Sequence, residues 1–325
     1  MQKNYVLGTD EAGYGPNLGP LVVGCTAWEV FYDKIDILFE LENRLSNIIA
    51  STPVELKNCN KILVIGDSKK LCQSGNIHTL LETLIPVFQI INKPVTSWQE
   101  LLKAIADKDV NEILNSKSQF FICEDHLLLN NPAFEKNVEK IKKMFLQAEI
   151  ILKNIAARVI SPKIFNELLE SLGNKSTLLT HVTMTLILSV LEMLSESRVT
   201  ILCDKHGGRN RYVDVLYHFF PDCSVIEIVT EGTPLSVYRF QHLNKNIEFR
   251  FQSKADSHIP AALASMTAKL LRELAMQQFN LFWKKFLPNL KPTAGYPVDA
   301  IRFFAQIEQI SKSIEIPKTE IWREK

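Results

Sequence analysis

The chain has 325 residues, a formal net charge of +1 and a hydrophobic content of 46%, which is enough to bury a large core. No stretch approaches the run of about 20 uncharged apolar residues that a membrane-spanning helix needs. A net charge near zero neither indicates nor excludes a nucleic-acid-binding face. The six cysteines are scattered without a Cys-x-x-Cys pair, which argues against disulfides and zinc sites. Reduced core cysteines and a cytoplasmic location are therefore expected.

Two apolar strands are predicted near the N-terminus, at 5–10 ("YVLGTD") and at 20–31 ("PLVVGCTAWEVF"). A glycine-rich loop joins them, and the first strand ends in the adjacent carboxylates Asp10 and Glu11. Carboxylates are rarely buried unless they are paired or bind a cation, so two acids at the end of an apolar strand call for an explanation. The segment 60–71 ("NKILVIGDSKKL") is predicted to be a further strand or turn with polar residues at its end.

Residues 76–175 have a mostly helical pattern. The segment 134–155 ("FEKNVEKIKKMFLQAEIILKNI") has apolar residues at three- and four-residue spacing, which predicts a helix. A second, apolar helix is predicted at 178–197. The buried strand at 198–204 ("RVTILCD") follows it directly and ends in an acid, Asp204.

The remaining pattern again alternates helices and strands. A helix is predicted at 211–219, strands at 223–231 and 246–256, and a long helix at 259–287. The last of these strands would also end in an acid, Asp256.

Interleaved strands and helices indicate the α/β class, with a mixed central sheet flanked by helices. The chain shows no internal repeat and no flexible linker. A single domain spanning 1–325 is therefore predicted, with a mainly helical insertion at about 85–160.

Four acids at strand ends form the candidate site: Asp10, Glu11, Asp204 and Asp256. Sites in open α/β sheets gather at the edge where strands end. Carboxylates that converge there repel one another unless cations neutralise them, and hard oxygen ligands select Mg²⁺ or Mn²⁺. Two such ions are the usual apparatus of phosphodiester hydrolysis. The alternative is that these acids are ordinary turn and helix-capping residues.

Four motifs resemble, in the same order, those of the type 2 ribonuclease H family. "GTDEAGYGPNLGPLVVG" (8–24) is similar to that family's opening signature, and "GDSKKL" (66–71) matches its Asp-Ser-Lys-Lys-Leu element. "SKADSHIPAALASMTAKLLRE" (253–273) resembles its Lys-Ala-Asp-Ser segment and the following helix. "GYP" (295–297) stands where the family carries Gly-Tyr-Gly.

The resemblance implies a ribonuclease H-like fold and a site with two metal ions, Mg²⁺ or Mn²⁺. It assigns the roles of catalytic residues and metal ligands to Asp10, Glu11, Asp204 and Asp256. The Asp204 assignment rests on its position at the end of a strand, because no string of the family matches there.

The resemblance also implies a substrate-binding set. The loop of Gly13, Tyr14 and Gly15 would bring backbone N–H groups against the 2′-hydroxyl of a ribonucleotide, and glycine lets the backbone approach closely. Tyr296 would stack on the sugar next to the scissile step, and Lys69 would contact the phosphate. Tyr14 departs from the family, which has Arg at this place, so a guanidinium contact is lost.

The segment 203–212 ("CDKHGGRNRY") is unusual for the family and gives a compact basic loop beside Asp204. Lys205 and Arg209 in this loop are candidate substrate-binding residues that would clamp a phosphate. The alternative is a solvated glycine turn with ordinary surface bases. Two further bases on the last long helix, Lys269 and Arg272, would either form helix-surface pairs or face the duplex backbone.

The expected activity is that of a metal-dependent endoribonuclease. It would hydrolyse the phosphodiester on the 5′ side of ribonucleotides in RNA–DNA hybrids or ribonucleotide-containing DNA duplexes. A monomer without membrane contact is expected. Two alternatives stay open, namely a ribonuclease H-fold nuclease that acts on another structured nucleic acid and a non-catalytic nucleic-acid-binding protein.

Overall fold

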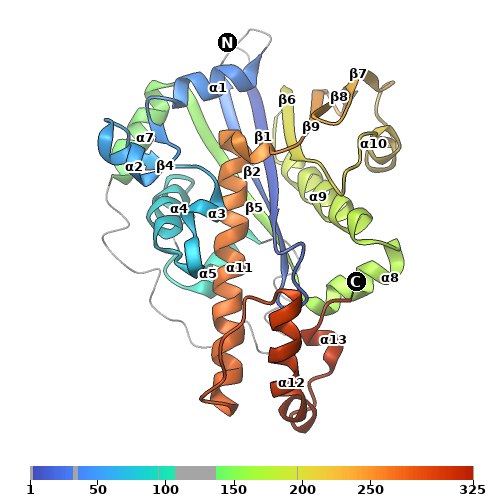
Figure 1. Ribbon diagram of the computed structural model, residues 1–325. Coiled ribbons are helices and arrows are strands. Elements are labelled where there is room, and N and C mark those ends of the chain that lie inside the picture. Colours follow the sequence, from blue (N-terminus) through green and yellow to red (C-terminus); the bar gives the residue numbers. More distant parts are fainter. Residues whose placement is uncertain (1–2, 32–35, 94, 107–136, 196, 325) are drawn as a thin grey trace.

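The computed structural model describes residues 3–31, 36–93, 95–106, 137–195 and 197–324 (Figure 1). A seven-stranded sheet forms its centre, in the spatial order β5-β2-β1-β6-β9-β8-β7. The strands of this sheet are β1 (Lys3–Ala12), β2 (Leu21–Phe31), β5 (Ile150–Ile160), β6 (Arg198–Asp204), β7 (Glu227–Glu231), β8 (Leu235–His242) and β9 (Lys245–Gln252). A separate two-stranded pair consists of β3 (Ile49–Ala50) and β4 (Leu63–Val64).

The sheet is mixed. The three central strands β1, β6 and β9 run parallel, whereas β2, β5, β8 and β7 pair antiparallel with their neighbours. Parallel neighbours need crossover connections, and helical segments supply them between β1 and β6. The carboxyl ends of the three central strands consequently lie at one edge of the sheet, where the candidate acids were predicted.

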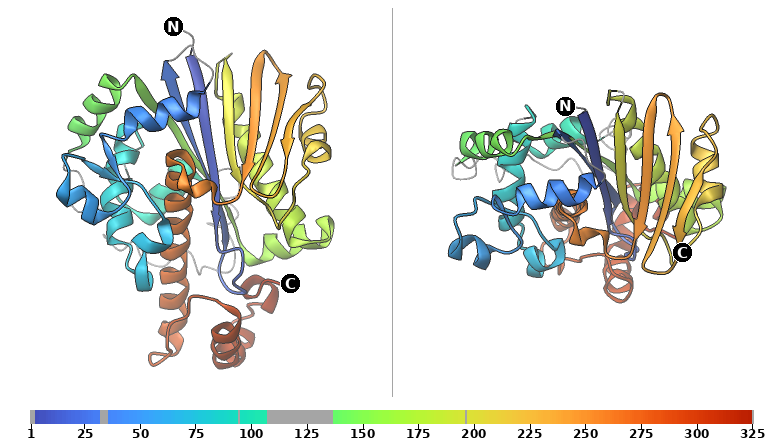
Figure 2. Two further views of the ribbon diagram at one scale, coloured as in Figure 1. Left: turned by 45° about the horizontal axis from the view of Figure 1, so that its top comes forward. Right: turned by 90° about the horizontal axis from the view of Figure 1, so that it is seen from above.

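Helices cover both faces of the sheet (Figures 1 and 2). The longer helices are α1 (Ile37–Leu45), α4 (His78–Ile90), α5 (Trp98–Ile105), α7 (Val138–Gln147), α8 (Pro162–Leu172), α9 (Lys175–Glu192), α11 (Ile259–Phe286) and α12 (Pro297–Ser313). Shorter helical segments are α2 (Pro53–Asn58), α3 (Ser68–Leu71), α10 (Val213–Phe219) and α13 (Lys318–Ile321), with 3₁₀ turns η1 (Gln73–Gly75) and η5 (Ala255–Ser257).

Two hydrophobic cores lie on opposite faces of the sheet, because successive side chains of a strand point to opposite sides. Val6 on β1 packs into the core beneath α4 and α11, whereas its neighbours Tyr5 and Leu7 pack into the core beneath α9. Near-continuous apolar runs in β1 and β2 are thus explained by burial on both faces. The mixed α/β class with helices on both sides of the sheet is confirmed.

Helix α11 is the longest of the described helices and crosses the sheet face along β1 and β2 (Figure 1). Its first turn lies directly on Gly8 of β1, where an added Cβ atom would meet the carbonyl carbon of Pro260 at 2.2 Å. Only glycine permits this approach. The contact fixes the start of α11, and with it the turn that carries Asp256, against the strand that carries Asp10.

The helix predicted for 134–155 is wrong in its second half. Helix α7 ends at Gln147, and β5 begins at Ile150. The apolar spacing of the first half continues by chance into "IILKNI", but this stretch is rich in Ile and pairs along its length with β2. Pairing with a long buried neighbour outweighs the local helical periodicity.

Two further predictions need correction. The predicted strand 246–256 ends at Gln252, so Asp256 lies in the 3₁₀ turn η5 and not on the strand itself. The polar alternation of β8 gave no clear signal, and this strand was not predicted. The strand predicted at 198–204 and the long helix from Ile259 are confirmed.

Of the predicted insertion, residues 94 and 107–136 lie outside the described part of the chain. Its described remainder contains α5, α7 and the edge strand β5, so the segment also contributes to the central sheet. None of the described helices combines the length and the apolar content that crossing a bilayer requires.

Candidate active site at the carboxyl edge of the sheet

The four predicted acids line one pocket. Strands β1 and β6 run parallel with Gly8 opposite Leu202, which brings Asp10 and Asp204 to the same level. The next parallel strand, β9, has Gln252 opposite Asp204, and the chain then turns into η5 with Asp256. The pocket has a volume of about 750 Å³, and all four acids are among its lining residues.

The carboxylates of the pocket destabilise one another in their charged forms. Burial raises the pKa of Asp10 to about 7, and the negative charges of Asp256 and Asp204 add to this effect. Burial, followed by the charge of Asp10, raises the pKa of Glu11 to about 8. Burial and the charge of Asp204 also raise the pKa of Asp256. Such a cluster of repelling acids is typical of a functional site.

Hydrogen bonds from neighbouring elements orient two of these acids. The side chain of Ser265 on α11 forms a hydrogen bond with Asp10 and lowers its pKa in part. The Ser265 hydroxyl also lies 2.9 Å from that of Ser68 on α3. The backbone N–H of Lys254 donates to Asp204 Oδ1 at 3.0 Å, which ties the end of β6 to the turn before η5.

Lys69 supplies a positive charge at the pocket wall. It lies on α3, whose first turn is capped by the Asp67 carboxylate through the backbone N–H groups of Lys69 and Lys70. The charge of Lys69 lowers the pKa of both Glu11 and Asp256. The "GDSKKL" segment therefore brings a cation toward the acids, where an anionic phosphate group could also reach it.

The donor set of the pocket fits Mg²⁺ or Mn²⁺. Its acids offer only oxygen ligands, the type that these hard cations prefer, and the raised pKa values indicate that positive charge is needed to keep the acids ionised. Within the described residues, no three His, Cys, Asp or Glu side chains form a compact metal-ligating group as they stand. The acids share the pocket wall without converging on one point.

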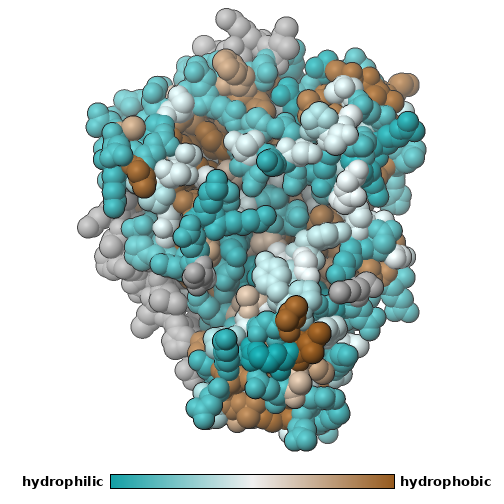
Figure 3. Space-filling view, viewed as in Figure 1, coloured by the Kyte–Doolittle hydropathy of each residue, from teal (hydrophilic) through white to brown (hydrophobic). Residues whose placement is uncertain are grey.

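The glycine loop between β1 and β2 borders the same pocket. Gly13 has a φ of +85°, and a Cβ atom there would meet Pro20 O at 2.6 Å and Arg272 Nε at 2.5 Å. Tyr14 is half-buried, and burial and the charge of Glu11 raise its pKa. Tyr296, at the start of α12, lines the pocket with 56% of its surface exposed. Figure 3 shows this face as mostly hydrophilic, with apolar residues at its lower end over α12.

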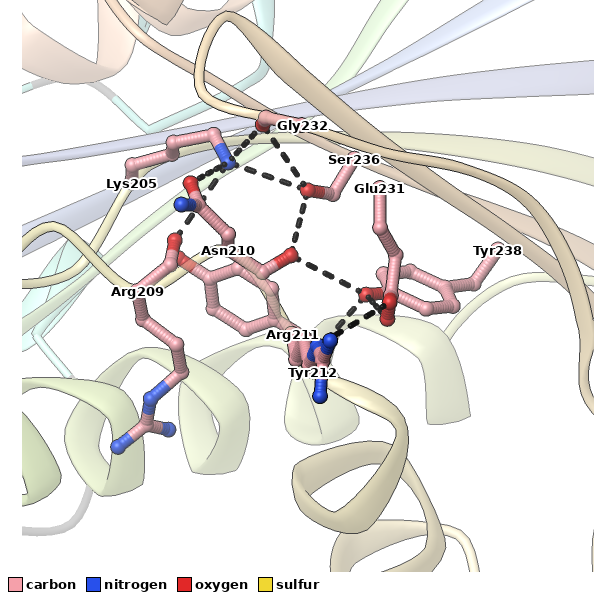
Figure 4. Close-up of polar contacts among 9 residues, drawn as sticks. All are labelled: Lys205, Arg209, Asn210, Arg211, Tyr212, Glu231, Gly232, Ser236 and Tyr238. Carbon is pink, nitrogen blue, oxygen red and sulfur yellow. Dashed lines mark hydrogen bonds and ion pairs between the residues drawn. The ribbon is translucent and has the colours of Figure 1, made fainter.

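The basic loop after β6 lies beside the pocket, and its lysine forms hydrogen bonds with other groups of the protein (Figure 4). The Lys205 ammonium donates to Gly232 O at 2.7 Å, Asn210 Oδ1 at 2.9 Å and Ser236 Oγ at 3.1 Å. The Arg209 guanidinium lies 5.8 Å from the centre of the Tyr212 ring. Among the described residues that line the main pocket, neither Lys205 nor Arg209 is present. Lys205 lines a smaller neighbouring pocket that shares Asp204 and Lys254 with the main one.

Two residues of the site region were not predicted in their actual roles. Ser265 forms the hydrogen bond with Asp10, and its signal in the sequence is a lone serine on an apolar helix face. Arg272 is 2% exposed and lies beneath Gly13, and its Nη1 atom is 3.8 Å from Glu273 Oε1. The expected pair with a helix neighbour therefore forms, but in the interior and not on the helix surface, and Arg272 also lines the pocket. Lys269 does form the expected helix pair, with Glu273, and lines the pocket.

No protein-family model matches the chain, and neither does any curated protein sequence. Solved structures do match. Ribonuclease HII of Archaeoglobus fulgidus, solved in complex with PCNA, is 14% identical, with 97% of this chain and 92% of that chain covered and a TM-score of 0.40.

Two further structures match over similar lengths. Ribonuclease H2 of Pyrococcus horikoshii OT3 is 16% identical, covering 98% of this chain and 92% of that chain with a TM-score of 0.39. Bst-RNase HIII, solved in complex with Mn²⁺, is 13% identical. The match covers 98% of this chain and 65% of that chain, with a TM-score of 0.41. These three solved structures are thus ribonucleases named HII, H2 and HIII.

Proposed function

We propose that the protein is a divalent-metal-dependent endonuclease of the ribonuclease H type. It hydrolyses the phosphodiester on the 5′ side of a ribonucleotide, in an RNA–DNA hybrid or in a DNA duplex that contains ribonucleotides, and leaves a 3′-hydroxyl and a 5′-phosphate. One observation carries the proposal: four carboxylates, from the ends of β1 and β6 and from the turn η5 that follows β9, line a pocket that also contains the glycine loop and Lys69.

Asp10, Glu11, Asp204 and Asp256 would hold Mg²⁺ or Mn²⁺. Bound ions would lower the pKa of a water molecule and neutralise the charge that develops on the phosphate. Neighbouring residues favour the ionised form of one of these acids and fix the orientation of another. The hydrogen bond from Ser265 favours the ionised form of Asp10, and the N–H of Lys254 fixes one oxygen of Asp204.

The other wall of the pocket would recognise the substrate. Lys69 offers a cation to the phosphate, and the Gly13–Gly15 loop offers backbone N–H groups to the ribose 2′-hydroxyl. Tyr296, more than half exposed at the pocket margin, would stack on the neighbouring sugar. Acids on one side and a backbone loop on the other would couple hydrolysis to the presence of a ribose.

The test is cleavage of labelled duplexes in Mg²⁺, in Mn²⁺ and in EDTA. A DNA duplex with one ribonucleotide, an all-DNA duplex and an RNA–DNA hybrid are compared, with Asp204→Asn as the inactive variant and the exposed Asp222→Asn as its matched control. A metal-dependent cut at the ribonucleotide, lost only in Asp204→Asn, is expected. Full activity of Asp204→Asn, or cleavage in EDTA, would refute the proposal.

Tyr14 favours a second candidate, a nuclease of the same fold with another structured nucleic acid as substrate. Its half-buried ring replaces the guanidinium that the resembling family has in this loop, so a phosphate contact or a structural contact is lost. Equal cutting of the all-DNA and the ribonucleotide-bearing duplex would favour this second candidate. Salt-sensitive binding without any cleavage would instead indicate a non-catalytic nucleic-acid-binding protein.

A further inference from the structure

Three segments that are far apart in the sequence meet behind the glycine loop. The backbone N–H groups of Asn17 and Leu18 both donate to Gly295 O, at 2.8 and 3.2 Å. The N–H of Arg323 donates to Asn17 O at 2.7 Å, and Asn17 Nδ2 donates back to Arg323 O at 3.1 Å. Leu18 and Trp322 form a further antiparallel bridge. The last residues of the chain thus hold the loop between β1 and β2 against the turn that precedes α12.

Arg323 is fully buried in this junction. Its Nη2 atom donates to Pro16 O, the carbonyl that ends the Gly13–Pro16 part of the pocket wall. Its guanidinium lies 4.8 Å from the centre of the Phe165 ring, a favourable cation–π distance. Its Nε and Nη1 atoms have no hydrogen-bond partner among the described residues. Within the described part of the chain, the one hydrogen bond of this buried guanidinium is therefore directed at the loop.

A second buried arginine supports the other side of the junction. Arg272 on α11 is 2% exposed, and its Nη2 atom donates to Ala294 O at 2.8 Å, next to Gly295 and Tyr296. Its Nε atom lies beneath Gly13. The two arginines repel each other: burial, together with the charge of Arg272, lowers the pKa of Arg323 to about 9.

This arrangement is costly for stability alone. Replacing buried charged groups by apolar side chains of similar volume is often neutral or stabilising, because the charges no longer need to be desolvated. A methionine would fill the space of Arg323 without repelling Arg272. What the guanidinium adds is a directed bond that sets the Pro16 carbonyl at a fixed place, and with it the loop that lines the pocket.

We propose that Arg323 is a positioning residue that sets the glycine loop and, through Gly295, the spacing between this loop and Tyr296. The proposal rests on the proposed function and deepens it, because it assigns ribose selectivity to the C-terminal segment. The four acids lie on β1, β6 and η5 and make none of the contacts of this junction. Loss of Arg323 should therefore weaken recognition of the ribose and leave metal binding intact.

The experiment compares Arg323→Met with Arg239→Met as the control. Arg239 lies on β8, is half-exposed and pairs with Glu248 at 2.7 Å, away from the pocket. The kcat/KM values for a one-ribonucleotide duplex and for an all-DNA duplex are measured in Mn²⁺, and Mn²⁺ affinity is titrated separately. Arg323→Met should lower the ratio of the two kcat/KM values by about 10- to 100-fold, because small displacements of binding groups cost rates of this order. Its Mn²⁺ affinity should stay within twofold of the wild type.

A second variant covers the case in which Arg323→Met does not fold. Gly295 has a φ of +83°, and a Cβ atom there would meet Leu18 O at 2.4 Å. Gly295→Ala should therefore separate the loop between β1 and β2 from the turn before α12, while Arg323 itself is unchanged. The same loss of ribose selectivity is expected. Unchanged selectivity in both folded variants would overturn the positioning role alone. A wild-type protein that never prefers the ribonucleotide would overturn the proposed function and this inference together.

Discussion

Asp10 destabilises the folded protein in a way that depends on pH, and Asp10→Asn should relieve this effect. Burial is the main reason that its pKa rises from 3.8 to about 7. Between these two values the folded protein holds a proton that the unfolded chain has already released. The free energy of unfolding of the wild type therefore falls as the pH rises through this window, and the full penalty is present above about pH 7.

The size of the effect follows from the shift. Each pKa unit corresponds to about 1.4 kcal/mol, so a shift of roughly three units sets an upper bound of about 4 kcal/mol. Asp10 is only partly buried, and its side chain also has the hydrogen bond from Ser265, so solvent and relaxation reduce the effect. We expect metal-free Asp10→Asn to be about 1–3 kcal/mol more stable than the wild type at pH 8.5. Near pH 4.5, which is less than one unit above the pKa of the unfolded carboxyl, the difference should shrink to about a quarter of its value at pH 8.5.

The assay is urea unfolding in EDTA, followed by circular dichroism at pH 4.5, 6, 7 and 8.5. Asp222→Asn serves as the control, because Asp222 is exposed and lies outside the pocket. The same Asp10→Asn protein should lose at least about a hundredfold in metal-dependent cleavage, since metal-assisted charge stabilisation is worth several kcal/mol. A variant that is no more stable than the wild type at pH 8.5, or whose stability difference does not change with pH, would refute this account of the acids.

Three further changes test the supports of the pocket. Ser265→Ala removes the hydrogen bond that lowers the Asp10 pKa, so the acidic limb of the pH–rate profile should move to higher pH; an unmoved limb would contradict this role. Lys69→Met should raise the KM for duplex substrate about tenfold or more and make it less dependent on salt, as fluorescence anisotropy at several salt concentrations would check. Gly8→Ala places a Cβ atom 2.2 Å from Pro260 C, so α11 must shift, and urea unfolding should report a loss of about 1–3 kcal/mol.

The positions of Asp10, Glu11 and Asp204 could be predicted from the sequence because each follows a local signal, whereas Asp256 lies in a turn beyond its predicted strand. Strand β6 is an apolar run that ends in Asp204, and the structure begins and ends it at the predicted residues. Asp10 and Glu11 close the predicted first strand in the same way. The parallel arrangement that brings these ends together follows from the alternation of strands and helices. The sequence therefore predicts that these acids lie at one edge of the sheet, and the pocket is found at that edge.

Elements whose form depends on distant partners could not be predicted. The "IILKNI" stretch continues a helical periodicity, and only its pairing with β2 makes it the edge strand β5. Strand β8 has charged and polar residues on its exposed side, and its pairing with β9 is what defines it. The residues around Lys205 gave the same sequence signal for a phosphate clamp and for a surface turn. The Lys205 ammonium donates to Asn210 in its own loop and to Gly232 and Ser236 far along the chain, and these long-range contacts are a tertiary feature.

The two walls of the pocket differ in how they are built, and this difference explains which of them the sequence reveals. The acidic wall is made by the ends of β1 and β6 and by the turn η5, so its residues follow local signals, either a short motif or an apolar strand that ends in an acid. The loop wall has a recognisable glycine motif, but the contacts that fix its shape come from α11, from the turn before α12 and from Arg323, which is 307 positions away from Pro16. A substitution in the last residues of the chain should therefore affect the proposed ribose recognition while the four candidate acids remain in place.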